Sequence, residues 1–154
     1  MAAQSLKILQ FQADLRKFAE KVKQDIVEVT VDTAVELFAD LVSETPRDTG
    51  TARKNWNPSI GAPDLSVKPK RVYDEYAKPS TKEDAAAVAR THAEAVFGAL
   101  HGQRLQPLYI SNALPYIEIL NTGTSQQAPA AFVETAVQRA EFRIVEKHIA
   151  ARVK

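Results

Sequence analysis

The longest regular pattern in the sequence is an apolar stripe within residues 5–43. Its members recur at steps of three and four residues, which is the spacing of one face of an α-helix: Phe11, Leu15, Phe18, Val22, Ile26, Val29, Thr33, Leu37 and Leu41. A second stripe begins at Val27 and lies beside the first, so the apolar face is narrow early and wide late. We therefore expect one long helix whose later half is the more deeply buried.

The β-branched residues between Asp25 and Val31 alternate well enough to indicate a strand instead. We prefer the helix because the spacing of three and four continues on both sides, with no turn residue between. A continuous helix would be on the order of 50 Å long, which is longer than a domain of this size can cover. We expect its amino-terminal half to project toward a neighbouring molecule.

A turn and an extended arm follow this helix. Pro46 ends it, since a proline disfavours α geometry in the residue before it, and the residues up to Gly50 supply turn chemistry. Residues 57–80 then hold four prolines and two short β-like pieces, at residues 65–67 and 71–73. We predict an extended arm or loose hairpin there, and a segment of this kind is a candidate contact surface.

A second helix is predicted over residues 81–101. It begins with a capping box at residues 80–83, in which a serine hydroxyl and a glutamate carboxylate each bond a backbone amide that the helix leaves free. Its inner face is made mostly of small residues and ends at Gly102: Ala85, Val88, Ala89, His92, Ala95, Val96, Ala99 and Leu100. Such a face packs closely against its neighbours.

Residues 107–120 contain two short β-prone runs, which we expect to pair with each other or to join a neighbouring sheet. Residues 121–124 close the second run, and Pro129 suits the first turn of a last helix over residues 129–152. The whole chain is predicted to be a single domain of the α+β class. It would combine a long amino-terminal helix, a small antiparallel sheet with a long loop or hairpin arm, an inserted middle helix, and a carboxy-terminal helix packed on the sheet.

Composition and charge narrow the possible functions. The chain has 154 residues, no cysteine and a formal net charge of +1. Without cysteine, neither a disulfide nor a thiolate metal site can form, and the near-neutral charge produces no global field toward nucleic acid. No apolar stretch approaches the roughly 20 residues that span a bilayer, and the first residues do not resemble a secretion signal. We therefore expect no membrane association and synthesis in the cytoplasm.

Candidate chemistry is scarce. His92, His101 and His148 lack the four-residue spacing of a helical metal site, and we interpret His92 as a packed histidine. Ser125 lies in a turn without the glycine spacing of a hydrolase nucleophile. The carboxylates of the first helix lie mainly off its apolar stripe, where solvation explains them. We predict no catalytic residue, no cofactor, no metal site and no enzyme activity.

Two segments carry a family resemblance. The first reads TPRDTGTARKNW over residues 45–56; the second reads YIEILNTGTS over residues 116–125 and continues through Ala128 and Pro129 to the last helix. In order and context they resemble the phage minor tail and tail-completion family. Its members typically have a helix, then Pro-x-Asp-Thr-Gly followed by a basic residue and Ser or Trp. A strand with Tyr and Glu, a Gly-Thr turn and an Ala-Pro step then precede a carboxy-terminal helix. We call the two stretches the first and second motif segments.

The resemblance implies a structural virion protein of a tailed-phage neck, forming a commonly hexameric ring at the head-proximal end of the tail. The implied partners are further copies of the chain, the tail tube protein, and the connector or stopper protein on the head side. DNA would pass through the lumen without sequence-specific binding, and Lys68, Lys70 and Arg71 are candidates to face it. The candidate interface residues, which either contact a neighbour or only stabilise the subunit, are Pro46, Asp48, Thr49, Gly50, Arg53, Trp56, Lys68, Lys70, Arg71, Glu118, Gly123, Thr124 and Pro129.

Other functions fit some of the same features. A head-side stopper or adaptor of the neck would use the same residues, and binding to tail tubes or to DNA-filled heads would distinguish these roles. From a different class, the basic arm and Trp56 suggest a small nucleic-acid-binding protein, which a salt-dependent mobility shift of DNA would favour. The mixed charges of the arm are also explained by a solvated surface.

Overall fold

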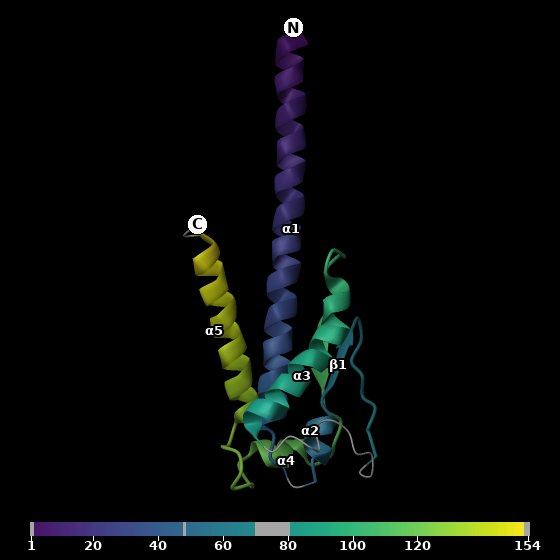
Figure 1. The fold of residues 1–154 in the computed structure, drawn as a ribbon, viewed down its shortest axis with the longest axis vertical. Coiled ribbons are helices and arrows are strands. Elements are labelled where there is room, and N and C mark those ends of the chain that lie inside the picture. The colour runs from purple at the N-terminus through teal and green to yellow at the C-terminus, as the bar shows by residue number, and fades with distance from the viewer. Residues whose placement is uncertain (1, 48, 70–80, 153–154) are drawn as a thin grey trace.

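The long amino-terminal helix is the axis of the molecule. A computed structural model describes residues 2–47, 49–69 and 81–152. Helix α1 (Ala2–Glu44) has 43 residues and is therefore about 65 Å long at 1.5 Å per residue. Its amino-terminal half extends well beyond the rest of the described fold (Figure 1). The prediction of one helix over residues 5–43 is confirmed.

The β-branched stretch of α1 is helical, so the strand alternative is wrong. The hydroxyl groups of Thr30 and Thr33 donate to the carbonyl oxygens four residues earlier, each at 2.7 Å, which satisfies them within the helix. Side chains of residues 7–26 are exposed, whereas Val27 and Val31 are only 5% and 2% exposed. The deeper burial predicted for the later half is confirmed, and this burial favours the helical conformation over local β propensity.

Two short strands form the sheet. Strand β1 (Asn57–Ile60) pairs antiparallel with β2 (Leu108–Ser111), and Asn57 lies opposite Ser111. The first of these stretches lies in the predicted extended arm, whose four prolines include Pro58, so the strand there was not predicted. In a sheet of two strands each strand keeps an open edge, so a residue without a backbone N–H is tolerated there.

Two predicted strands have other structures. Residues 65–67 are irregular, and the second run within 107–120 is the short helix α4 (Ile117–Asn121). The expected pairing of the two runs is therefore wrong, because the first run is β2 and pairs with β1. An apolar run of five residues is too short to separate a strand from a helical turn. The strand expected at residues 71–73 lies outside the described residues.

The middle helix predicted over residues 81–101 is present as α3 (Lys82–Phe97), which continues into a 3-10 turn, η2 (Gly98–Leu100). The Thr81 hydroxyl accepts a hydrogen bond from the Asp84 amide at 3.0 Å, so the cap lies one residue later than expected. Three alanines spaced four residues apart are fully buried, which allows close packing on α1: Ala85, Ala89 and Ala93. A short helix, α2 (Thr51–Lys54), lies between α1 and β1.

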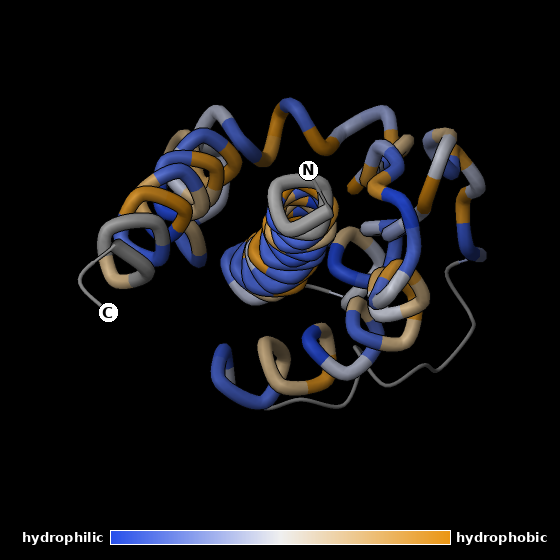
Figure 2. The backbone as a smooth tube through the Cα atoms, turned by 90° about the horizontal axis from the view of Figure 1, so that it is seen from above, coloured by the Kyte–Doolittle hydropathy of each residue, from blue (hydrophilic) through white to orange (hydrophobic). Residues whose placement is uncertain are grey.

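The carboxy-terminal helix α5 (Phe132–Arg152) begins after Pro129 rather than with it. Ala131, just before the helix, has a φ of 59° and therefore a left-handed backbone. The Asn121 side-chain oxygen accepts a hydrogen bond from the Val133 amide at 2.9 Å, so a residue of α4 caps α5. Viewed along α1, the helix α5 lies on one side of it and the remaining elements lie around the others (Figure 2).

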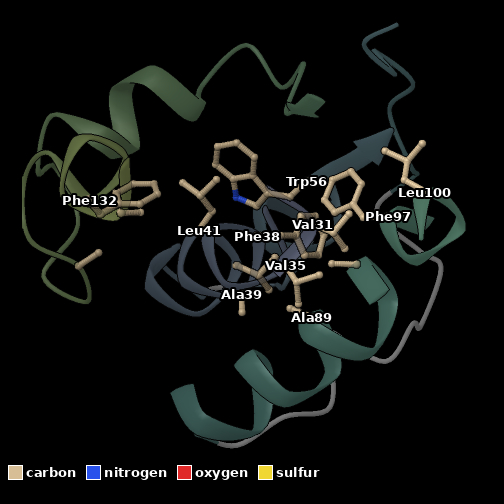
Figure 3. Close-up of a cluster of buried hydrophobic side chains, with 14 of the residues drawn as sticks. Val31, Val35, Phe38, Ala39, Leu41, Trp56, Ala89, Phe97, Leu100 and Phe132 are labelled. Carbon is tan, nitrogen blue, oxygen red and sulfur yellow. The ribbon is translucent and has the colours of Figure 1, made fainter. Parts of the chain in front are cut away.

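One apolar core joins these elements. Phe38, Phe97 and Phe132, from α1, α3 and α5, are at most 1% exposed. Figure 3 shows Leu41 and Trp56 between Phe132 on one side and Phe97 on the other. Apolar side chains of both strands pack against the same cluster, so the carboxy-terminal helix shares its core with α1 and the sheet. The predicted α+β architecture is confirmed. None of the described helices is long and apolar enough to cross a membrane.

Candidate functional site

The first motif segment is fastened to the end of α1 by buried polar groups. Arg53 is 6% exposed, and its guanidinium donates to the carbonyl oxygens of Thr45 at 2.8 Å and Ser43 at 3.2 Å. The positive charge also complements the negative end of the helix dipole. Trp56 Nε1 donates to Thr45 Oγ1 at 2.8 Å, and that hydroxyl donates to the Leu41 carbonyl at 2.6 Å. Arg53 and Trp56 therefore stabilise the fold from within.

The arm predicted over residues 57–80 is described up to Pro69, and its part after β1, residues 61–69, is tied to the first motif segment. Asn55 accepts a hydrogen bond from the Lys68 amide at 2.7 Å through its side-chain oxygen. The Lys68 ammonium donates to the Lys54 carbonyl at 2.8 Å, and the Lys54 ammonium donates to the Pro69 carbonyl. This stretch is thus held in place, and both ammonium groups bond to backbone carbonyls of the same chain.

The second motif segment contains α4 and, after it, a tight turn at Gly123 that leads toward α5. Gly123 has a φ of 86°, and its amide donates to the Leu120 carbonyl at 3.2 Å, as expected of a glycine that ends a helix. A Cβ atom at this position would lie 2.8 Å from the Ala130 Cβ, so the turn has room only for glycine. Thr124 Oγ1 donates to the Ile119 carbonyl at 2.9 Å and fixes the other side of the turn.

The two motif segments meet across an open groove. The groove lies at the end of the molecule where Figure 1 shows α2 and α4. The Arg47 amide donates to Gln127 Oε1 at 2.8 Å, which joins the segments directly. Nearby, Asn112 Nδ2 donates to the Ala52 carbonyl at 3.0 Å. The groove has a volume of about 570 Å³. Its walls are Pro46, Arg47, Thr49, Gly50, Thr51, Ala52, Val67, Lys68, Pro69, Leu114, Tyr116, Leu120, Ser125 and Gln127.

The groove offers apolar contacts, hydroxyl groups and two cationic residues, Arg47 and Lys68. Tyr116 is 39% exposed, and partial burial raises the pKa of its phenol. Within the part of the wall that the structure describes, no carboxylate or imidazole faces this space. Asp48 lies outside the described residues. A groove of this composition suits a protein surface that carries apolar and hydrogen-bonding groups.

Four carboxylates spaced four residues apart on α1 form ion pairs with α3 and α5. The pairs are Asp32–Lys147 at 2.8 Å, Glu36–Arg90 at 2.8 Å, Asp40–Arg143 at 2.9 Å, and Glu44 with Lys82 at 2.7 Å and Arg139 at 3.6 Å. Burial raises the pKa of Glu44, but the hydrogen bond and charge of Lys82, with Arg139, outweigh it and lower the pKa overall. We expected solvation alone to explain the acids of α1. For these positions that prediction is wrong, because their side chains form ion pairs with α3 and α5.

Among the described side chains, no group of three or more His, Asp or Glu residues is arranged to hold a metal ion. Asp32, Glu36, Glu94 and His101 do line a smaller hollow of about 400 Å³, but its first two carboxylates are paired with cations. His92 contacts the ring of Phe38 edge-on, with ring centroids 5.7 Å apart, which confirms it as a packed histidine. The side chain of His148 lies outside the described residues.

The predicted interface residues fall into four groups. Those that line the groove are Pro46, Thr49, Gly50 and Lys68. Those buried inside the fold are Arg53 and Trp56. Those exposed near the second motif segment are Glu118, Gly123, Thr124 and Pro129. Those outside the described residues are Asp48, Lys70 and Arg71.

Sequence reasoning missed several residues that build the groove, including Arg47, Tyr116, Leu120 and Gln127. All four lie within or beside the two motif segments, so their position in the sequence was the available signal. Their side-chain types carry no distinctive chemistry, and only the fold brings Arg47 and Gln127 together. Comparison with protein-family models, curated proteins and solved structures finds no match to this chain.

Proposed function

We propose that this chain is a structural subunit of a tailed-phage neck. Copies of it form a hexameric ring at the head-proximal end of the tail, complete the tail, and join it to the connector on the head side. The subunit acts by assembly and not by catalysis. The observation that carries the proposal is the meeting of the two motif segments, distant in sequence, along the walls of one groove.

The construction of the groove supports a mechanical role. Its walls are held by hydrogen bonds to the backbone, as at Asn55, Lys68 and Asn112, so its shape is set before any partner arrives. A preformed surface loses little conformational entropy on binding. Apolar residues such as Leu114 and Leu120 beside hydroxyl groups form the kind of mixed surface that protein partners bind.

Lys68, the cation in the described part of the arm, and Lys54 of α2 favour this role over nucleic-acid binding. The ammonium groups of Lys54 and Lys68 bond to backbone carbonyls of the subunit, where they stabilise the groove. Trp56, which suggested a stacking platform for bases, is 6% exposed and belongs to the core. In the proposed ring, DNA passes without sequence-specific contacts.

Electron microscopy of a phage that carries this chain tests the proposal. Particles assembled without the chain should be unjoined heads together with free tails of irregular length. Supplying the wild-type chain should restore virions. Tyr116→Ala, which removes an aromatic ring from the groove wall, should fold normally and lower the yield of joined particles at least tenfold.

A matched control removes an exposed ring from another element. Phe142 on α5 is 63% exposed and does not line the groove, so Phe142→Ala should fold and leave joining close to the wild-type level. Circular dichroism and thermal unfolding would show that both variants are folded. Normal virions in the absence of the chain, or full joining by the Tyr116 variant, would contradict the proposal.

A further inference from the structure

The projecting half of α1 carries an apolar stripe that no described element covers. Ile8, Phe11, Leu15 and Phe18 are 55–65% exposed, and Val22 is 38% exposed. Their steps of three, four, three and four residues are those of a coiled-coil seam. The stripe ends at Val22. Farther along the helix, the ion pair between Asp32 and Lys147 marks the contact between α1 and α5. We call these five residues the α1 stripe.

We propose that the α1 stripe binds the α1 stripe of a second copy of the chain. The two helices pair antiparallel, in a register that places Leu15 of one copy opposite Phe18 of the other. Val22 then lies opposite Phe11 on either side of the two-fold axis. This inference does not depend on the proposed role in a phage neck.

Charge complementarity selects this register. Lys7, Asp14, Lys21 and Glu28 each directly precede a position of the seam, and all four are exposed. Residues at this heptad position face each other across an antiparallel pair. In the proposed register Lys7 faces Glu28 and Asp14 faces Lys21, so each of these charges has an opposite partner. A shift of one heptad in either direction sets like charges against each other, which is unfavourable.

A parallel pair fits the sequence less well. It would place Asp25, which occupies the next seam position after Val22, opposite the same carboxylate of the second copy. Two facing carboxylates in an apolar seam are costly. The flanking charges Asp14 and Lys21 would face Ala19 and Ile26, so they would gain no ion pairs. In the antiparallel register Asp25 lies beside Ile8 at the end of the overlap, next to solvent.

The area available is sufficient for a specific but weak pair. The five apolar side chains, 38–65% exposed, contribute on average roughly 100 Å² each, or on the order of 1,000 Å² in total for the two copies. This is near the lower limit of specific interfaces. We therefore expect concentration-dependent dimerisation, with dissociation constants on the order of 1–100 μM.

Cysteine cross-linking tests the register directly, because the chain has no cysteine of its own. Mixing Leu15→Cys chains with Phe18→Cys chains under mild oxidation should give the mixed disulfide in preference to either homodisulfide. Leu9→Cys is the control, since Leu9 is 61% exposed but lies on the opposite side of the helix from the stripe. Predominance of the Leu15→Cys homodisulfide, as in a parallel pair, overturns the proposal. So does cross-linking no greater than that of the Leu9 control.

Sedimentation equilibrium tests the energetics. Phe18→Lys should abolish the dimer, while Leu9→Lys should leave it unchanged. Lys21→Glu should weaken association about tenfold, because it sets one acid of each copy against Asp14 of the other. The double variant Asp14→Lys with Lys21→Glu should restore association to about the wild-type level. The proposal is overturned if the wild-type chain stays monomeric at concentrations up to about 100 μM. It is also overturned if the double variant dimerises more weakly than Lys21→Glu alone. Tyr116→Ala should still dimerise, because Tyr116 lies in the groove and not in the α1 stripe. A failure of the neck proposal can therefore be distinguished from a failure of the dimer proposal.

Discussion

Gly123 and Gly102 both have a left-handed backbone, with φ of 86° and 73°, but their surroundings differ. A Cβ at Gly123 would lie 2.8 Å from the Ala130 Cβ, whereas a Cβ at Gly102 would meet nothing within 4 Å. Gly102→Ala should therefore cost only the backbone strain, about 1 kcal/mol. Gly123→Ala should cost roughly 1–3 kcal/mol more, because Ala130 must move. Urea denaturation of the two variants measures the difference, and equal losses would show that the turn can relax without cost.

Two residues of the first motif segment show why residue-level predictions of the site were incomplete. The order of Thr, Gly, Arg and Trp after a helix was readable from the sequence, but where each side chain points was not. Arg53 and Trp56 turn inward because the end of α1 presents carbonyl oxygens and the Thr45 hydroxyl, which need donors. A motif on the surface and a buried cap of a helix end have the same sequence pattern. Only the fold therefore shows that Arg53 and Trp56 are buried.

At the scale of elements, length decided which predictions held. The helices α1, α3 and α5 each span several turns. Their periodic patterns are therefore long enough to identify them as helices even where a short stretch is ambiguous. Strand β1 and helix α4, with four and five residues, carry too few positions for periodicity to identify them. Strand β1 is fixed by its pairing with β2, and α4 by its contact with the start of α5. Both are long-range contacts, which a local sequence pattern does not contain.

The contact between α1, α3 and α5 should depend on pH through Glu44. Its pKa is lowered below the ordinary 4.5 because Lys82 and Arg139 outweigh the effect of burial. A carboxylate with a lower pKa in the folded state contributes stability above its unfolded pKa and loses it as the pH falls through the folded pKa. The wild-type chain should therefore exceed Glu44→Gln in free energy of unfolding near pH 7. The gap should close as the pH falls below about 4.5.

Denaturation of both chains at several pH values measures this gap. Glu83, an exposed acid in the first turn of α3, provides the control. Glu83→Gln removes the same charge but none of the ion pairs between the described helices, so its free energy of unfolding near pH 7 should stay close to that of the wild-type chain. A gap for Glu44→Gln that stayed constant from pH 7 to pH 3 would contradict the assignment of the lowered pKa to Glu44.

At the scale of the whole molecule, the two proposed contact surfaces lie at opposite ends of α1. The groove adjoins the carboxy-terminal end of the helix, and the α1 stripe covers its projecting half (Figure 1). The core begins at Val27, so the body of the protein and its groove do not rely on the stripe for burial. The two surfaces can therefore be altered separately.

Removal of residues 1–22 is the sharpest test of this separation. The shortened chain keeps every described core residue and every described ion pair between α1 and the other helices, because these begin at Val27 and Asp32. We expect cooperative unfolding with a free energy within about 1 kcal/mol of the full chain, because exposed helical residues contribute little to stability. We also expect a monomer at concentrations where the full chain dimerises, as measured by sedimentation. Loss of cooperative unfolding would show that the projecting half supports the body, and dimerisation of the shortened chain would place the self-contact elsewhere.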